Sequence, residues 1–169
     1  NNKGSEDIFK RISNNLPNEY LGINIGPNKD TKNRINDYLE CYKKFHNLGN
    51  YIAINISSPN TENLRDFHNK NELLDLLSAI NEEKKVLKSN TPLAIKISPD
   101  IKINEIESIS QILIEKKIDI LIVSNSTDKN REVLKNINKL ERGGLSGKPI
   151  EKISNNLISK FYKTVGKKV

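Results

Sequence analysis

The strongest constraint on the fold is a regular alternation of short apolar runs with longer amphipathic stretches. Four runs rich in β-branched residues cover residues 20–25, 51–55, 93–97 and 118–124. Each run is nearly continuous in apolar character, which is typical of a strand buried on both faces. The chain is therefore predicted to form a parallel sheet whose strands are joined by helices.

The stretches between these runs have helical spacing. Residues 6–14 are predicted to form an opening helix that turns Ile8, Phe9 and Ile12 inward and is closed by Pro17, and Thr31 is a candidate cap for the next helix. Four later helices are predicted from apolar faces at Ile35, Tyr38, Leu39 and Tyr42; at Leu73, Leu74, Leu76, Leu77 and Ile80; at Ile106, Ile109, Ile112 and Leu113; and at Ile153, Leu157, Ile158 and Phe161.

Two α/β folds fit this alternation, an open doubly wound sheet and a (β/α)8 barrel. A dinucleotide-binding doubly wound sheet normally has a Gly-x-Gly-x-x-Gly turn after its first strand. Here that region reads Gly22-Ile-Asn-Ile-Gly-Pro-Asn28, in which the glycines flank the end of the strand. The barrel is favoured, and four strands are half of one. The chain is therefore expected to be a piece of a longer protein, as its lack of Met also suggests.

Polar residues interrupt each apolar run near its carboxyl end. They are Asn24, Asn55, Lys96 and, after the fourth run, Ser124, Asn125 and Ser126. A single polar residue of this kind could be a satisfied structural group, because burial requires a hydrogen-bond partner. Four successive strands with the same pattern favour a shared site, since the carboxyl ends of barrel strands open onto one face.

The residue types at these ends suggest binding of a planar polar ring. Asparagine offers both a donor and an acceptor, and a lysine can neutralise an anion or an electron-rich ring. No carboxylate is among them, so a catalytic base is expected from the loop Ile56-Ser-Ser-Pro-Asn-Thr61. A solvated turn is an equal alternative for this loop, because serine is a poor base without a desolvated pocket or a water relay.

The composition limits the alternatives. The net charge of +7 and pI of 9.4 raise the possibility of a nucleic-acid-binding module, but the basic residues are interspersed with acids, and a solvated surface is favoured. The single Cys41 excludes an internal disulfide, and His46 and His68 are expected at the surface, which disfavours a metal site. No stretch reaches the roughly 20 apolar residues of a membrane span, and no secretory signal is evident.

Six motifs in order along the chain resemble the dihydroorotate dehydrogenase family. The most specific is Asn55-Ile-Ser-Ser-Pro-Asn-Thr61, followed by Leu64-Arg65. The others are Asn1-Asn-Lys-Gly4, Gly22-Ile-Asn-Ile-Gly26, Leu93-Ala-Ile-Lys-Ile-Ser-Pro-Asp100, Ile122-Val-Ser-Asn-Ser126 and Gly143-Gly-Leu-Ser-Gly-Lys-Pro149.

The resemblance implies that residues 1–169 are part of an FMN-binding (β/α)8 barrel domain that oxidises dihydroorotate to orotate in pyrimidine synthesis. It implies that Ser58 is the base that removes the C5 proton while hydride passes from C6 to flavin N5, and that Thr61 holds the water through which the proton leaves. Members that reduce a membrane quinone have Ser at this position and soluble members have Cys, so Ser58 indicates the quinone-linked class. Cys41 is expected in a helix, distant from this loop.

The resemblance also assigns binding roles. Asn24, Asn55, Lys96, Ser124 and Gly147 would contact FMN, with Lys96 near the pyrimidine end of its ring. Asn1, Asn55, Asn60, Asn125 and Ser126 would hydrogen-bond orotate. The chain departs from the family in having serine at positions 124 and 126, where threonine is common, and Pro27 where lysine is frequent.

Several parts of the family's proteins are not among these 169 residues: the N-terminal amphipathic helices that reach the membrane, the first strands of the barrel, and the last two strands with the glycine-rich turns that bind the FMN phosphate. The chain by itself is therefore expected to bind FMN weakly and to be inactive. The resemblance implies a peripheral location on the cytoplasmic face of a bacterial inner membrane, with the mitochondrial inner membrane as the alternative. Other FMN barrels acting on pyrimidines remain an alternative, although those relatives use Cys as the acid/base residue.

Overall fold

The centre of the molecule, a computed structural model, is a parallel sheet of four strands. The structure describes residues 3–58, 64–129, 131–132, 134–141 and 143–169. Neighbouring strands pair in chain order. The strands are β1 (Gly22–Ile25), β2 (Tyr51–Asn55), β3 (Leu93–Ile97) and β4 (Ile120–Val123), and the helices are α1 (Ser5–Asn14), α2 (Arg34–Phe45), α3 (Lys70–Val86), α4 (Ile103–Glu115) and α5 (Glu151–Val165), with short 3-10 helices η1 (Leu64–His68), η2 (Ile137–Leu140) and η3 (Lys148–Ile150).

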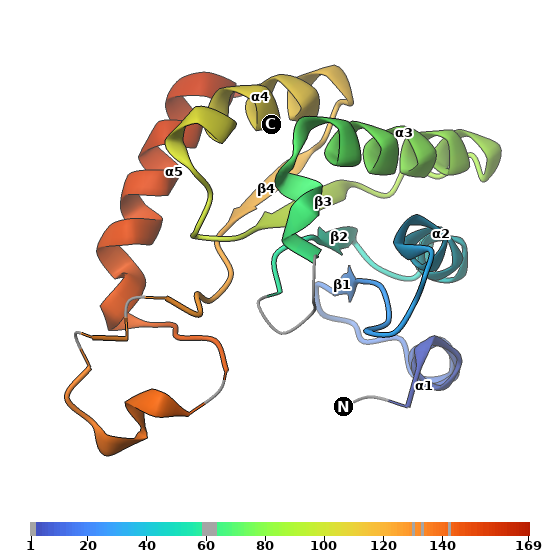
Figure 1. Cartoon of the computed structure of the whole chain (residues 1–169). Coiled ribbons are helices and arrows are strands. Elements are labelled where there is room, and N and C mark those ends of the chain that lie inside the picture. The colour runs from blue at the N-terminus through green and yellow to red at the C-terminus, as the bar shows by residue number, and fades with distance from the viewer. Residues whose placement is uncertain (1–2, 59–63, 130, 133, 142) are drawn as a thin grey trace.

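Helices α2 to α5 form an arc on one side of the sheet, and α1 packs beside α2 (Figure 1). Isoleucines at alternate positions of β1, β2 and β3 point toward this arc, and all are buried: Ile23, Ile25, Ile52, Ile54, Ile95 and Ile97. A doubly wound sheet would carry helices on both faces. Four parallel strands with helices on one face are instead half of a (β/α)8 barrel, which confirms the favoured fold.

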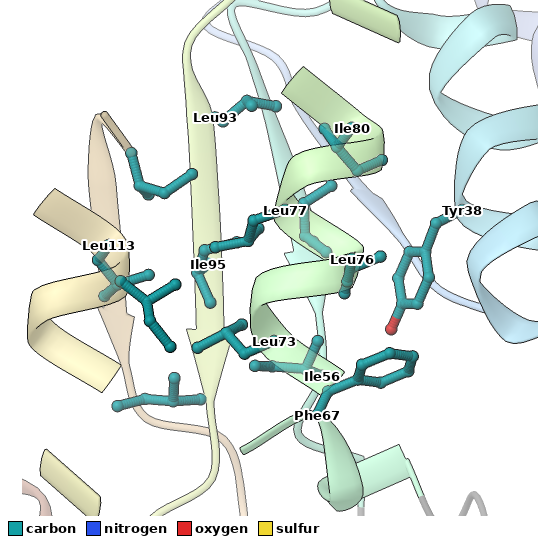
Figure 2. Packing of buried hydrophobic residues seen from close by; sticks show 14 of the residues in the cluster. Tyr38, Ile56, Phe67, Leu73, Leu76, Leu77, Ile80, Leu93, Ile95 and Leu113 are labelled. Atoms are coloured by element: carbon teal, nitrogen blue, oxygen red, sulfur yellow. The ribbon is translucent and has the colours of Figure 1, made fainter. Parts of the chain in front are cut away.

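The main core lies between α3 and the sheet. Leu73, Leu76 and Leu77 of α3 are fully buried and belong to one hydrophobic cluster with Ile95 of β3. Figure 2 shows this layer continuing from Leu113 of α4 on one side to Tyr38 and Phe67 on the other. The apolar spacing predicted for α3 and α4 is therefore the spacing of their buried faces.

Two predicted details of the helices are wrong. The side chain that caps α2 is Asn33, whose Oδ1 accepts a hydrogen bond from the Asn36 amide at 3.1 Å, whereas Thr31 donates to Asp37 at 3.2 Å. In α5, Ile158 is 45% exposed although Leu157 and Phe161 are buried. Its side chain borders a shallow apolar hollow beside the open edge of β4.

The strand prediction is accurate for the inner strands and too generous for the outer ones. β2 and β3 have the predicted bounds, but β1 begins at Gly22 and β4 covers only Ile120–Val123. The Asp119 carboxylate accepts a hydrogen bond from the Leu93 amide at 2.8 Å, so a side chain takes the place of a backbone partner just before β4 begins. β4 is half-exposed throughout, because it is an edge strand of this sheet.

Candidate active site

Three of the polar residues predicted from the sequence share the face of the sheet opposite the helices. The register pairs Asn24 with Ala53 and Asn55 with Lys96. Since Asn55 lies two residues after Ala53 on β2, the side chains of Asn24, Asn55 and Lys96 point the same way. The parallel strands also end at the same edge. The three side chains therefore share one face near the carboxyl edge of the sheet, and their joint role in a site stays a prediction.

Lys96 is the one cation within these strands. It is half-buried in the middle of an apolar run, and no carboxylate among the described residues forms an ion pair with it. Holding a charged group in such a place is unfavourable unless a ligand or another polar group compensates it. The position therefore suits an anionic or electron-rich ligand on this face.

A hydrogen-bond chain joins the ends of β2 and β4. Asn55 Oδ1 accepts from the Ser57 hydroxyl at 2.7 Å, and Asn125 Nδ2 donates to the same hydroxyl at 3.0 Å. Ser57 is completely buried, so the loop after β2 does not begin as a solvated turn. The Tyr38 hydroxyl donates to the Asn55 carbonyl at 2.6 Å, and burial raises the pKa of Tyr38, which keeps it a donor.

Ser58 follows directly after this buried serine and is half-buried. Its neighbour Ser57 is fixed on two strand ends, so the backbone that leads into Ser58 is held at the edge of the polar face. Thr61, Asn60 and Asn1, to which the family resemblance also gives roles in the site, lie outside the described residues. Their roles stay predictions.

The residues after β4 line an open hollow of about 800 Å³. Ser124, Asn125 and Ser126 form one wall, and Gly147 is on another. Gly147 has a φ of 76°, a conformation that favours glycine. Ser124 Oγ also lies 3.2 Å from Ser154 Oγ of α5, so the start of α5 contributes to this hollow.

A second hollow, of about 530 Å³, lies at the β1 end of the sheet and is lined by both Asn24 and Asn55. Cys41 of α2 also lines it, which confirms that this cysteine is helical. Burial raises the pKa of the Cys41 thiol, so it is a weak nucleophile. Asn24 and Asn55 line this second hollow, whereas Ser124, Asn125, Ser126 and Gly147 line the first, and Lys96 and Ser58 are in the lining of neither. Asn55 is hydrogen-bonded through Ser57 to Asn125, which connects the two groups.

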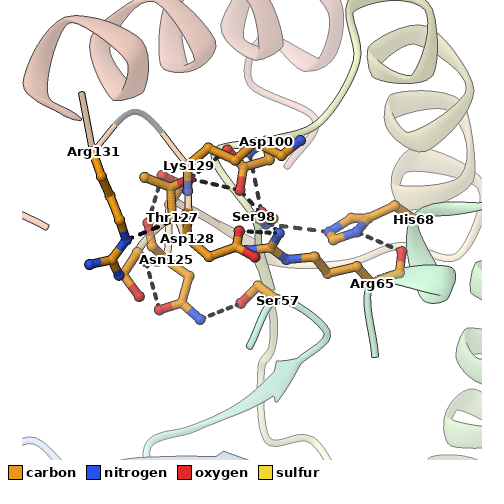
Figure 3. Close-up of polar contacts among 12 residues, drawn as sticks. Ser57, Arg65, His68, Ser98, Asp100, Asn125, Thr127, Asp128, Lys129 and Arg131 are labelled. Carbon is orange, nitrogen blue, oxygen red and sulfur yellow. Dashed lines mark hydrogen bonds and ion pairs between the residues drawn. The ribbon is translucent and has the colours of Figure 1, made fainter. Parts of the chain in front are cut away.

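A polar network connects the segments that follow β2, β3 and β4, and it contains residues for which no role was predicted from the sequence. It includes Arg65 and His68 of η1, Ser98 and Asp100 after β3, and Thr127 after β4 (Figure 3). The expectation that His68 lies at the surface is wrong, because it is only 6% exposed. Its Nε2 accepts the Ser98 amide at 3.3 Å and its Nδ1 lies 2.9 Å from the Arg65 carbonyl, an arrangement that requires a neutral imidazole.

His68 gives the fold an acid-sensitive component. Burial is the main cause that lowers the pKa of His68 from 6.5. The hydrogen bond to the Arg65 carbonyl and the charges of Glu105 and Asp100 oppose it, and the Arg65 guanidinium adds a smaller lowering. The unfolded state then binds the proton more readily, so stability is full above pH 6.5 and falls as the pH drops toward the lower folded pKa. Relative to His68→Gln, whose amide keeps one acceptor and one donor, the native protein should lose up to about 1.4 kcal/mol per pH unit in that window.

Urea unfolding of both proteins between about pH 8 and pH 5 measures this difference. Ionisable groups that do not interact with His68 contribute equally in the two proteins and cancel in the comparison. A difference that does not change with pH would show that His68 does not titrate on unfolding.

Comparison with known proteins places these features in context. The family model described as dihydroorotate dehydrogenase matches residues 1–169. The chain is 41% identical to a dihydroorotate dehydrogenase (quinone) of Buchnera aphidicola over 100% of this chain and 52% of that protein, and 36% identical to a mitochondrial one of Cyclocybe aegerita over 98% and 52%. A ligand-free crystal structure of DHODH from Eimeria tenella matches with a TM-score of 0.85 and 32% identity, over 98% of this chain and 50% of that one. The chain thus spans about half the length of the relatives it matches.

Proposed function

Because the chain belongs to the dihydroorotate dehydrogenase family and supplies about half of its (β/α)8 barrel, we propose that the protein oxidises dihydroorotate to orotate with FMN and passes the electrons to a quinone, as a step of pyrimidine biosynthesis. The observation that carries this proposal is the common face of Asn24, Asn55 and Lys96 at the carboxyl end of the sheet.

The donor set on this face suits a flavin. Enzymes of this family are flavin-dependent, and an isoalloxazine ring has amide-like edges that asparagine side chains can pair with. Asn24, Asn55, Ser124 and Gly147 would hold FMN, and Lys96 would supply the positive charge that the reduced ring requires. Lys96 has no ion-pair partner among the described residues, which leaves its charge available for that role.

The substrate would lie beside Asn55, Asn125 and Ser126. The family resemblance adds Asn1 and Asn60 to these contacts. The Asn125 amide donates to Ser57, and its Oδ1 accepts the Ser126 amide at 2.8 Å, so both ends of this side chain are fixed. A side chain fixed in this way presents its remaining hydrogen-bonding capacity to orotate in one orientation.

Ser58 would take the C5 proton and pass it to a water held by Thr61. When bound, FMN supplies an acceptor for the hydride from C6, so that the C5–C6 bond of the product becomes double. Serine is an inefficient base in water. The half-buried position of Ser58, next to the fully buried Ser57, supports its use here because desolvation and a fixed backbone favour proton transfer.

Serine at position 58 assigns the protein to the quinone-linked class. A bacterial and a mitochondrial relative are both named dihydroorotate dehydrogenase (quinone). A quinone dissolves in the bilayer, so the protein would work as a peripheral protein at the cytoplasmic face of a bacterial inner membrane. No helix among the described residues is long and apolar enough to span a membrane.

Acceptor choice tests this function directly. The purified full-length protein that contains this chain should convert dihydroorotate to orotate with a water-soluble quinone analogue, and at least about 100-fold more slowly with NAD⁺ or fumarate, an expected difference of about 2.7 kcal/mol in the barrier. Orotate formation is followed by its absorbance. Equal rates with fumarate would assign the protein to another class, and no orotate with any acceptor would reject the function.

A further inference from the structure

The loop that carries Ser58 is held at both ends by residues that follow the neighbouring strands. At its start, the Ser57 hydroxyl contacts Asn55 at 2.7 Å and Asn125 at 3.0 Å. At its end, Leu64 is buried in the core and Arg65 enters the polar network. The structure therefore fixes the residues on both sides of the loop, and both attachments reach the segment after β4.

The second attachment is centred on the carboxylate of Asp100. Arg65 Nη1 lies 3.1 Å from Asp100 Oδ2, and Thr127 Oγ1 donates to both oxygens, at 2.7 and 2.9 Å. The Asp100 side chain is only 9% exposed. Three successive strand-end loops, those after β2, β3 and β4, thus meet at one nearly buried carboxylate (Figure 3).

A second carboxylate touches the same guanidinium but is much more exposed. Asp128 Oδ1 lies 2.9 Å from Arg65 Nη1, and its side chain is 51% exposed. Nε and Nη2 of Arg65 are buried without a hydrogen-bond partner among the described residues. Asp100 is the more buried of the two carboxylates on Arg65. Arg65 Nη1 also donates a hydrogen bond to Asp128, and the exposure of that pair to solvent reduces its contribution.

His68 links the segments that carry Arg65 and Asp100. It joins the Arg65 carbonyl to the Ser98 amide, and Ser98 Oγ in turn accepts the Asp100 amide at 3.2 Å. Thr127 is held as well, since its amide and carbonyl pair with Leu145. The partners of Asp100 are thus positioned by contacts of their own, which leaves the carboxylate few alternative arrangements.

We propose that Asp100, with Arg65 and Thr127, is a positioning network that sets Ser58 at the reacting carbon of the substrate. The inference rests on the proposed dehydrogenase function, and these three residues act through the loop, not on the substrate. Loosening the second attachment releases the end of the loop at Arg65, while the contacts of Ser57 at its start remain. A shift of about 1 Å in a catalytic group lowers the rate about 100-fold, whereas binding through Asn125 is unaffected.

The two carboxylates on Arg65 provide a matched pair of variants. Asp100→Asn should slow flavin reduction at saturating dihydroorotate by about 10- to 100-fold, with orotate affinity changed by less than about 3-fold. Asp128→Asn removes the negative charge of the other carboxylate paired with this guanidinium and should change the rate by less than about 2-fold. Thr127→Val should behave like Asp100→Asn, and Thr127→Ser, which keeps the hydroxyl, should restore the rate.

The experiment uses the flavin-loaded protein with three readouts. These are the stopped-flow rate of flavin reduction, orotate affinity from the flavin absorbance change, and hydrogen exchange of the backbone around residues 55–68. Faster exchange there in Asp100→Asn and Thr127→Val, with a slow rate and intact orotate binding, supports the network. If Asp100→Asn does not fold, Thr127→Val gives the same comparison, because it keeps both carboxylates and removes only the three hydrogen bonds of the Thr127 hydroxyl, two to Asp100 and one from the Lys129 amide.

Two outcomes would overturn the inference. One is an unchanged reduction rate in Thr127→Val, and the other is an equal effect of Asp100→Asn and Asp128→Asn. Failure of the proposed function is distinguishable, because dihydroorotate would then fail to reduce the flavin of the unaltered protein.

Discussion

Replacing Ser58 with alanine is expected to slow flavin reduction by dihydroorotate by about 100- to 10,000-fold at neutral pH, with flavin still bound. The loss is large because the C5 proton then has no positioned acceptor, and water must take it. Flavin binding should persist because the residues assigned to FMN, such as Asn24 and Lys96, lie on the sheet and not on this loop.

The measurement is an anaerobic stopped-flow experiment with saturating dihydroorotate. Ser108→Ala in α4 is the matched control, since it removes a hydroxyl that only donates to the Glu105 carbonyl within the same helix. The control should reduce its flavin at the native rate. A Ser58→Ala protein that does the same would mean that another group is the base.

Lys96→Met is expected to have the second largest effect, slowing flavin reduction by about 100- to 1,000-fold and weakening FMN binding. Reduction places negative charge on the flavin ring, and a fixed cation that stabilises developing charge in a site is worth about that factor. Methionine retains most of the side-chain volume, so the half-buried position should remain filled. The reduction potential of the bound flavin should become more negative.

Rates are measured with FMN in excess, so that weaker binding is not read as slower chemistry. Lys85→Met in α3 is the control because this lysine is exposed and belongs to the helix layer. If Lys96→Met keeps the native potential and rate, the positive charge on the sheet serves no role toward the flavin.

Sequence periodicity predicts the layer structure of this chain well, because burial and strand period are local properties. β2 and β3 are interior strands whose apolar residues are covered by helices, and their predicted bounds are those observed. Edge strands are harder to predict. β4 carries the same apolar pattern but is only half-buried, because it lies at the edge of this sheet. The sequence does not show how many strands flank a given strand.

The site is predicted in part for a similar reason. Asn24, Asn55 and Lys96 stand out because each is polar inside an apolar run, and parallel pairing brings them together. His68 does not stand out, since its burial results from contacts with Ser98 and the core that lie far from it in sequence. Arg65 and Asp100 belong to motifs of the family resemblance, but only the structure shows that they meet.

The direct test of the central claim is an anaerobic titration of the flavin of the purified full-length protein that contains this chain with dihydroorotate, followed by a quinone. The account predicts that one equivalent of dihydroorotate bleaches the flavin and that a quinone analogue restores its colour. Flavin that stays oxidised in excess dihydroorotate would contradict the claim that this barrel is a dihydroorotate dehydrogenase.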